Sequence, residues 1–143
     1  MTAVRILVVD DDAAIRSLLR LVASRAGFEV HVAADGKQAM ALITSERYDV
    51  MLLDLMMPVM SGYEVLAQLD GIPSAPPVII VSAMVESRPS ALDSARVQGI
   101  LHKPFDVERV VQLLTDVVQA MPRDEEVSAE IIAPPPGPPQ AVC

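Results

Sequence analysis

Three short runs of consecutive apolar residues, each followed by a polar residue, limit most strongly what this chain can fold into. They span residues 6–9, 50–53 and 78–81, and they are followed by Asp10, Asp54 and Ser82. A strand with one face in water alternates apolar and polar residues, whereas a strand buried on both faces of a parallel sheet is apolar throughout. The three runs therefore predict central strands of a parallel sheet that is covered by helices on both faces.

The segments between these runs have helical patterns. The first has apolar residues on one helical face, followed by a stop signal: Ile15, Leu18, Leu19, Val22 and then Gly27. Further helices are expected from Asp35, from Ser61 (which has capping-box spacing with Glu64), over residues 89–97, and from Asp106 to Met121. Residues 28–33 and 100–102 are two more strand candidates. Five strands alternating with five helices predict an α/β fold with a doubly wound parallel sheet.

Charge and composition narrow the classes of function. The formal net charge is −8, which disfavours binding to nucleic acid or to an anionic membrane surface. No apolar run reaches the length of a membrane span, the N-terminal residues have no signal-peptide pattern, and the one cysteine is the last residue. These features predict a cytoplasmic protein. We expect residues 1–121 to form one domain and the Pro-rich residues 122–143 to be a flexible tail.

Polar side chains collect at the ends of the predicted strands. Asp10 and Asp11 follow the first strand, Asp54 follows the third, Ser82 ends the fourth, and Lys103 ends the fifth. In a sheet with the flavodoxin-like strand order 2-1-3-4-5, ligands bind at the carboxyl ends of strands one and three, where the order reverses. We therefore expect Asp10 and Asp11 to face Asp54, with Ser82 and Lys103 on the neighbouring strands.

These residue types fit phosphoryl transfer. Three converging carboxylates stay ionised together only with a cation among them, and oxygen ligands without His or Cys favour Mg²⁺. Lys103 adds a positive charge and Ser82 a hydroxyl, and both can contact a phosphoryl group. Phosphoryl transfer depends mainly on in-line positioning and neutralised charge, and a carboxylate such as Asp54 can be the nucleophile.

The chain resembles the receiver domain of two-component response regulators, the CheY-like family. The matching segments are residues 6–12 (ILVVDDD), 52–62 (LLDLMMPVMSG), 81–83 (VSA) and 102–105 (HKPF). Each motif is weak alone, but four in this order and spacing are specific together. The resemblance covers about residues 4–121.

The resemblance implies a set of residue roles. Asp54 would be the phosphoacceptor, and Ser82 and Lys103 would contact the phosphoryl group. Asp10, Asp11, Asp54 and the backbone carbonyl of Met56 would bind Mg²⁺, and the bond between Lys103 and Pro104 would be cis.

The resemblance also implies partners. The expected phosphodonor is phosphohistidine on a sensor histidine kinase or a histidine phosphotransfer protein. The expected output is contact with a downstream effector protein, or a dimer formed on phosphorylation. We expect a stand-alone signalling domain with no enzyme activity beyond its own phosphorylation and dephosphorylation.

Two other functions stay open, and each depends on one residue. A haloacid-dehalogenase-like phosphatase also uses Asp, Mg²⁺, Lys and Ser/Thr, but it has a second Asp where this chain has Met56. A receiver fold used only for docking is favoured by Ile100, at the position where the family usually has Tyr or Phe.

Two further predictions concern the surroundings of the acidic residues. Asp12 is expected to be solvated or to cap a helix rather than to bind metal. Met56 and Met84, each two residues past a site residue, cannot orient a hydrolytic water, which predicts a long-lived phosphoryl group on Asp54.

Overall fold

The apolar runs form the three central strands of one parallel sheet. The computed structural model describes residues 3–83 and 95–120. Its strands are β1 (Arg5–Val9), β2 (Glu29–Ala33), β3 (Val50–Leu53), β4 (Val78–Ser82) and β5 (Val97–His102). They pair in parallel in the order β2-β1-β3-β4-β5. The predicted doubly wound, flavodoxin-like sheet with strand order 2-1-3-4-5 is confirmed.

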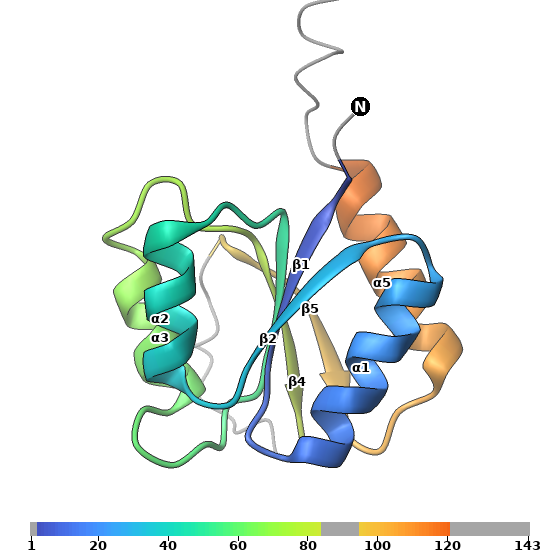
Figure 1. Cartoon of the computed structure of the whole chain (residues 1–143), viewed down its shortest axis with the longest axis horizontal. Helices are drawn as coiled ribbons and strands as arrows, with labels where there is room; N and C mark the ends of the chain where they lie inside the picture. Colours follow the sequence, from blue (N-terminus) through green and yellow to red (C-terminus); the bar gives the residue numbers. More distant parts are fainter. Residues whose placement is uncertain (1–2, 84–94, 121–143) are drawn as a thin grey trace, which may run out of the picture.

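Helices cover both faces of the sheet. In the described residues these are α1 (Ala13–Arg25), α2 (Gly36–Ser45), α3 (Gly62–Leu69) and α5 (Val107–Ala120). Helices α2 and α3 lie on one face, and α1 and α5 lie on the other (Figure 1). Leu7 of β1 packs in the core under α2 and α3, and its neighbours Ile6 and Val8 pack in the core under α1 and α5. The central strands are apolar at every position because both of their faces are buried.

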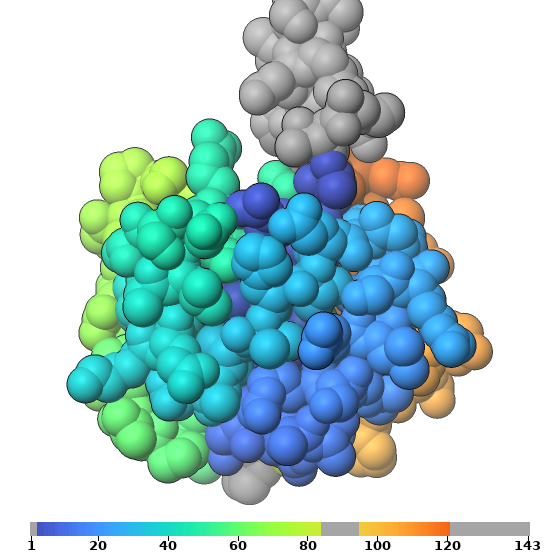
Figure 2. Space-filling model, viewed as in Figure 1, coloured from blue at the N-terminus to red at the C-terminus, as the bar shows by residue number. Residues whose placement is uncertain are grey.

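The edge strands β2 and β5 have a less continuous apolar sequence pattern than the central strands. Glu29 of β2 and His102 of β5 are exposed, because each strand has a partner on one side only. Figure 2 shows the β2 segment (light blue) at the surface between α1 and α2. The apolar pattern of an edge strand is therefore interrupted, and its bounds are harder to read from the sequence.

Side-chain caps fix where the helices begin. The Asp12 carboxylate accepts from the backbone N–H groups of Ala14 and Ile15 at the start of α1, so the capping role predicted for it is confirmed. Ser61 and Glu64 form the predicted capping box at the start of α3. These caps give hydrogen-bond partners to backbone N–H groups in the first turns of α1 and α3.

One predicted element differs from the structure. The helix expected over residues 89–97 falls mostly on residues 84–94, which lie outside the described residues, but its last residue, Val97, begins β5. Backbone pairing is the reason: the Arg96 carbonyl accepts from the Val78 N–H at 2.8 Å, and Val97 pairs with Val78. The strand predicted from Ile100 therefore starts earlier. Met84 and the predicted tail also lie outside the described part of the chain.

Candidate functional site

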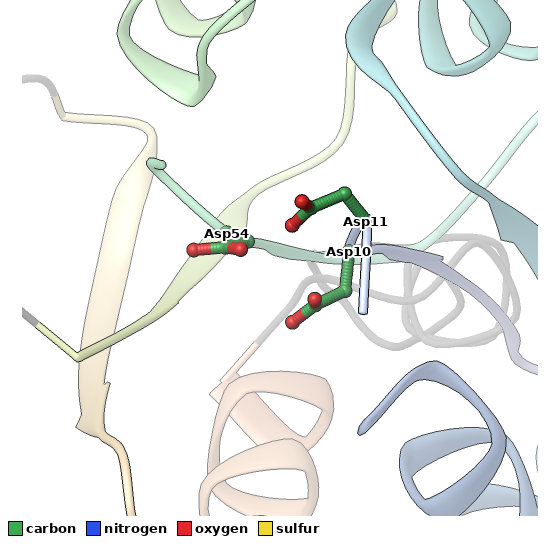
Figure 3. Close-up of side chains that lie close together, drawn as sticks. All are labelled: Asp10, Asp11 and Asp54. Atoms are coloured by element: carbon green, nitrogen blue, oxygen red, sulfur yellow. The ribbon is translucent and has the colours of Figure 1, made fainter. Parts of the chain in front are cut away.

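Three carboxylates meet where β1 and β3 end. Val9 and Leu53 are paired in the sheet, and the Asp54 N–H donates to the Val9 carbonyl at 3.0 Å. The residues that follow the two strands are therefore adjacent. Carboxylate oxygens of Asp10, Asp11 and Asp54 lie within 4.8 Å of one another. Figure 3 shows that the side chains of Asp10 and Asp11 leave β1 toward the side where Asp54 lies.

Asp10 is the most constrained member of this acidic cluster. It is buried, and its Oδ1 accepts from the Asp12 N–H at 2.9 Å. Its backbone carbonyl accepts from Nη1 of Arg16, one turn into α1, at 2.7 Å. Asp11, by contrast, is exposed. The turn from β1 into α1 thus holds one carboxylate inside the protein and leaves the next one facing solvent.

Lys103 reaches the cluster from the end of β5. Its backbone N–H donates to the Ser82 carbonyl at 3.0 Å, and its bond to Pro104 is cis, as expected. Its Nζ lies 2.9 Å from Asp10 Oδ2 and 3.5 Å from Asp54 Oδ2. Burial by itself lowers the pKa of Lys103, but the contacts with Asp10 and Asp54 outweigh burial and raise that pKa. Lys103 is therefore a fixed ammonium within the site.

The charge of Asp54 is costly in the absence of a further cation. Burial first, and then the charge of Asp10, raise the pKa of Asp54 from 3.8 to about 6, against the opposing effects of the Met56 N–H and Lys103. Within the described residues, the contact of the buried Asp10 Oδ2 is the Lys103 ammonium, at 2.9 Å. Three neighbouring carboxylates that share one ammonium still carry excess negative charge, and their oxygens fit a hard divalent cation such as Mg²⁺.

The loop after β3 wraps tightly around Asp54. Gly62 donates its N–H to the Leu55 carbonyl at 2.9 Å, and a Cβ at Gly62 would collide with the Asp54 carbonyl oxygen. Val59 in the same loop has a positive φ of 70° and is 77 % exposed. The sequence analysis predicted neither the close approach at Gly62 nor the positive φ of Val59. It also did not identify the hydrogen bond from Arg16 to the Asp10 carbonyl. A glycine at the first position of a helix was the available signal for close approach.

The remaining predicted residues flank the cluster. Ser82 is fully buried at the end of β4, the neighbour of β3. The Met56 N–H donates to Asp54 Oδ1 at 3.2 Å, and Met56 is 56 % exposed. The role of its carbonyl as a metal ligand stays a prediction. Ile100 is 37 % exposed on β5.

A doubly wound domain with three carboxylates at the reversal of strand order, and a lysine ion-paired to two of them, has the architecture of a CheY-like domain. The comparison with protein families agrees. The chain belongs to the response regulator receiver domain family of two-component systems, whose model matches residues 6–115. This membership favours the receiver interpretation over the phosphatase alternative.

Similar proteins support the assignment. Response regulator MprA of Mycobacterium tuberculosis is 42 % identical over 111 residues, which are 76 % of this chain and 48 % of that protein. MprA of Mycobacterium ulcerans is 36 % identical over 133 residues, which are 92 % of this chain and 57 % of that protein. The chain thus spans about half the length of the curated relatives it matches.

Two solved structures show the same fold. A CheY-like receiver domain protein from Methanospirillum hungatei is 25 % identical, with a TM-score of 0.78, and the match covers 82 % of this chain and 95 % of that one. The response regulator TrrA from Thermotoga maritima, solved in complex with Mg²⁺ and BeF, is 31 % identical, with a TM-score of 0.71. That match covers 80 % of this chain and 98 % of TrrA. No helix in the described part of this chain is long and apolar enough to cross a membrane.

Proposed function

We propose that this chain is a phosphorelay receiver in which Asp54 accepts a phosphoryl group from phosphohistidine, in a Mg²⁺-dependent reaction. One observation carries the proposal. Carboxylate oxygens of Asp10, Asp11 and Asp54 lie within 4.8 Å of one another, and the Lys103 ammonium contacts two of these residues. This set contains a carboxylate nucleophile, oxygen ligands for a hard cation and a fixed positive charge.

The residues around Asp54 prepare it for attack. The Met56 N–H and the Lys103 ammonium hold its two carboxylate oxygens. One carboxylate oxygen forms the new bond to phosphorus as the phosphorus–nitrogen bond to histidine breaks, and the electron pair of that bond stays on the imidazole. Lys103 then faces a phosphoryl oxygen, and the buried Ser82 hydroxyl is a second contact for the group.

The metal would be held at the acidic cluster. We assign Asp10, Asp11, Asp54 and the backbone carbonyl of Met56 as its ligands, and Mg²⁺ there would neutralise charge on the phosphoryl oxygens. The relative TrrA, whose structure holds Mg²⁺ and BeF, supports this choice of metal.

The partners follow from the family and the charge. A sensor histidine kinase or a histidine phosphotransfer protein is the donor, and the output is a contact with an effector protein or a dimer formed on phosphorylation. The net charge of −8 argues against direct contact with nucleic acid.

We assign residues 1–121 as the receiver domain and residues 122–143 as its tail, in a cytoplasmic protein. The domain acts as a signalling acceptor and turns over no substrate other than its own phosphoryl group.

The test is phosphorylation of the pure protein by acetyl phosphate, followed by intact-mass measurement. We expect one added phosphoryl group with Mg²⁺, and none after chelation or in Asp54→Asn. A gain of phosphate by Asp54→Asn equal to that of the unsubstituted chain would overturn the assignment of the acceptor. Absence of both phosphorylation and Mg²⁺ binding would favour the docking-only alternative.

A further inference from the structure

We propose that Met56 is a peroxide-sensitive modification site, and that its oxidation to the sulfoxide shortens the lifetime of the phosphoryl group on Asp54. The kinetic part rests on the proposed function. The assignment of the oxidation site does not, because it depends only on exposure and position.

Met56 is the most accessible of the described methionines. It is 56 % exposed, whereas Met51 is fully buried and Met57 is 8 % exposed. Met40 and Met60 are partly buried and pack against the core under α2 and α3, and the Met60 sulfur also contacts Gln68 Nε2 at 3.8 Å. Oxidation of a methionine follows the access of the oxidant to its sulfur. Among these residues, Met56 is therefore expected to react first.

The same residue is fixed beside the acceptor. Its N–H donates to Asp54 Oδ1 at 3.2 Å, which ties its backbone to the carboxylate that takes the phosphoryl group. Leu55 and Met57 on either side are buried, so Met56 is the side chain of this stretch that faces solvent. A chemical change in this side chain therefore alters the edge of the acceptor site and spares the core beneath it.

The oxidation step balances with peroxide as the oxidant. The thioether sulfur attacks one peroxide oxygen, an S–O bond forms, and the O–O bond breaks. The departing hydroxide takes the proton from the new S–OH group and becomes water, so the sulfur loses two electrons and the peroxide gains them. The product has a polar oxygen that accepts hydrogen bonds well, in place of a sulfur that accepts them weakly.

This change favours loss of the phosphoryl group. A water that donates a hydrogen bond to the sulfoxide oxygen is held at the edge of the site more firmly than by the thioether sulfur, which accepts only weakly. The water oxygen bonds to phosphorus as the bond from phosphorus to the Asp54 oxygen breaks. The products are the free carboxylate, inorganic phosphate and a proton released to solvent. One net hydrogen bond gained in the transition state corresponds to about fivefold faster hydrolysis.

The experiment treats the full chain with hydrogen peroxide and locates the added oxygen by fragmentation mass spectrometry. Treated and untreated samples are then phosphorylated with acetyl phosphate and Mg²⁺, and the decay of the phosphorylated mass is followed. Met56→Leu and the matched variant Met60→Leu are each compared with their own untreated samples. We expect about fivefold faster decay after peroxide in the unsubstituted chain and in Met60→Leu, and no change in Met56→Leu.

The two parts of the inference fail separately. Oxidation of Met40, Met57 or Met60 ahead of Met56 would overturn the site assignment. A sulfoxide at Met56 with an unchanged decay rate would overturn the kinetic effect. If the untreated protein takes no phosphate, the proposed function and the kinetic effect fail together, while the oxygen-mapping result still decides the site assignment.

Discussion

The Lys103 ammonium lies 2.9 Å from Asp10 Oδ2 and 3.5 Å from Asp54 Oδ2, so one cation is shared by two carboxylates from different strands. The side chain of Lys103 is 18 % exposed and that of Asp10 only 1 %. A buried carboxylate needs a partner, and in the metal-free site this lysine is the cation that supplies it. A divalent ion bound at the proposed site would share Asp10 with the ammonium. We therefore expect Lys103 to stabilise the metal-free fold and to compete with the metal.

Replacing Lys103 with Met should have opposite effects on stability and on metal binding. Without Mg²⁺, loss of the ammonium leaves the Asp10 charge uncompensated and should lower the free energy of unfolding by about 2–4 kcal/mol. Mg²⁺ should bind at least about threefold more tightly, because a positive charge beside the cluster is gone. Urea denaturation in chelator and a Mg²⁺ titration followed by calorimetry measure the two effects.

Lys37→Met is the matched control, since Lys37 is exposed on α2 and the charge change is the same. It should move neither measurement appreciably. Weaker Mg²⁺ binding by Lys103→Met would show that Lys103 orients the carboxylates more than it competes for them.

The pKa of Asp54 predicts a pH dependence of stability in the absence of metal. This pKa is raised from 3.8 to about 6, so between these pH values the unfolded chain has released a proton that the folded chain keeps. Raising the pH through this window should therefore lower the free energy of unfolding, by on the order of 3 kcal/mol once the pH is above the folded-state pKa. Asp54→Asn should lack this loss and should be the more stable protein at pH 7 in chelator.

Urea denaturation at pH 4, 5, 6 and 7 checks this prediction, and Asp70→Asn is the control because Asp70 is exposed. The two Asn variants should differ little at pH 4 and diverge as the pH rises. Parallel pH profiles for Asp54→Asn and the unsubstituted chain would mean that burial does not penalise the Asp54 charge.

The central part of the fold and the acidic cluster were predictable from the sequence for one reason. Strands buried on both faces are continuous apolar runs, and the residues that end them must meet at one edge of a parallel sheet. Asp10 and Asp54 follow directly from that rule. The edge strand β5 was placed too late because Gln98 and Gly99 interrupt its apolar pattern, while backbone pairing with β4 still extends it to Val97.

Other features depend on three-dimensional proximity and have no periodic signal. The hydrogen bond from Arg16 to the Asp10 carbonyl is an example: the partners are six positions apart, and nothing in the sequence marks the contact. The approach of Gly62 to the Asp54 backbone is another, since only the path of the loop after β3 brings the two together.

Gly62→Ala should strongly destabilise the protein and displace Asp54, the proposed acceptor. A Cβ at residue 62 would overlap the Asp54 carbonyl oxygen and lie 2.7 Å from the Leu55 Cα, and backbone atoms cannot rotate out of the way. We expect a loss of about 3 kcal/mol in the free energy of unfolding, together with weaker Mg²⁺ binding.

Gly71→Ala provides the contrast. Its added Cβ would lie 3.6 Å from the Gln68 carbonyl oxygen, an ordinary contact, so its effect should stay within about 1 kcal/mol. Equal effects of the two substitutions in urea denaturation would contradict the close approach at Gly62.

Val59→Gly should stabilise the protein, although it removes an apolar side chain. Val59 has a φ of 70°, a region that costs a β-branched residue about 1–2 kcal/mol. Because the residue is 77 % exposed, burial of its side chain offsets little of that cost. Glycine removes the strain but adds about 0.5–1 kcal/mol of backbone entropy to be lost on folding. The net gain should be about 0.5–1 kcal/mol, measured as a higher urea midpoint at an unchanged slope.

Val107→Gly tests the reasoning. Val107 is 41 % exposed and is the first residue of helix α5, so glycine there adds backbone entropy to be lost on folding and relieves no positive φ. The two substitutions delete the same side chain and should shift the midpoint in opposite directions. Equal losses would mean that the loop after β3 is unstrained at Val59.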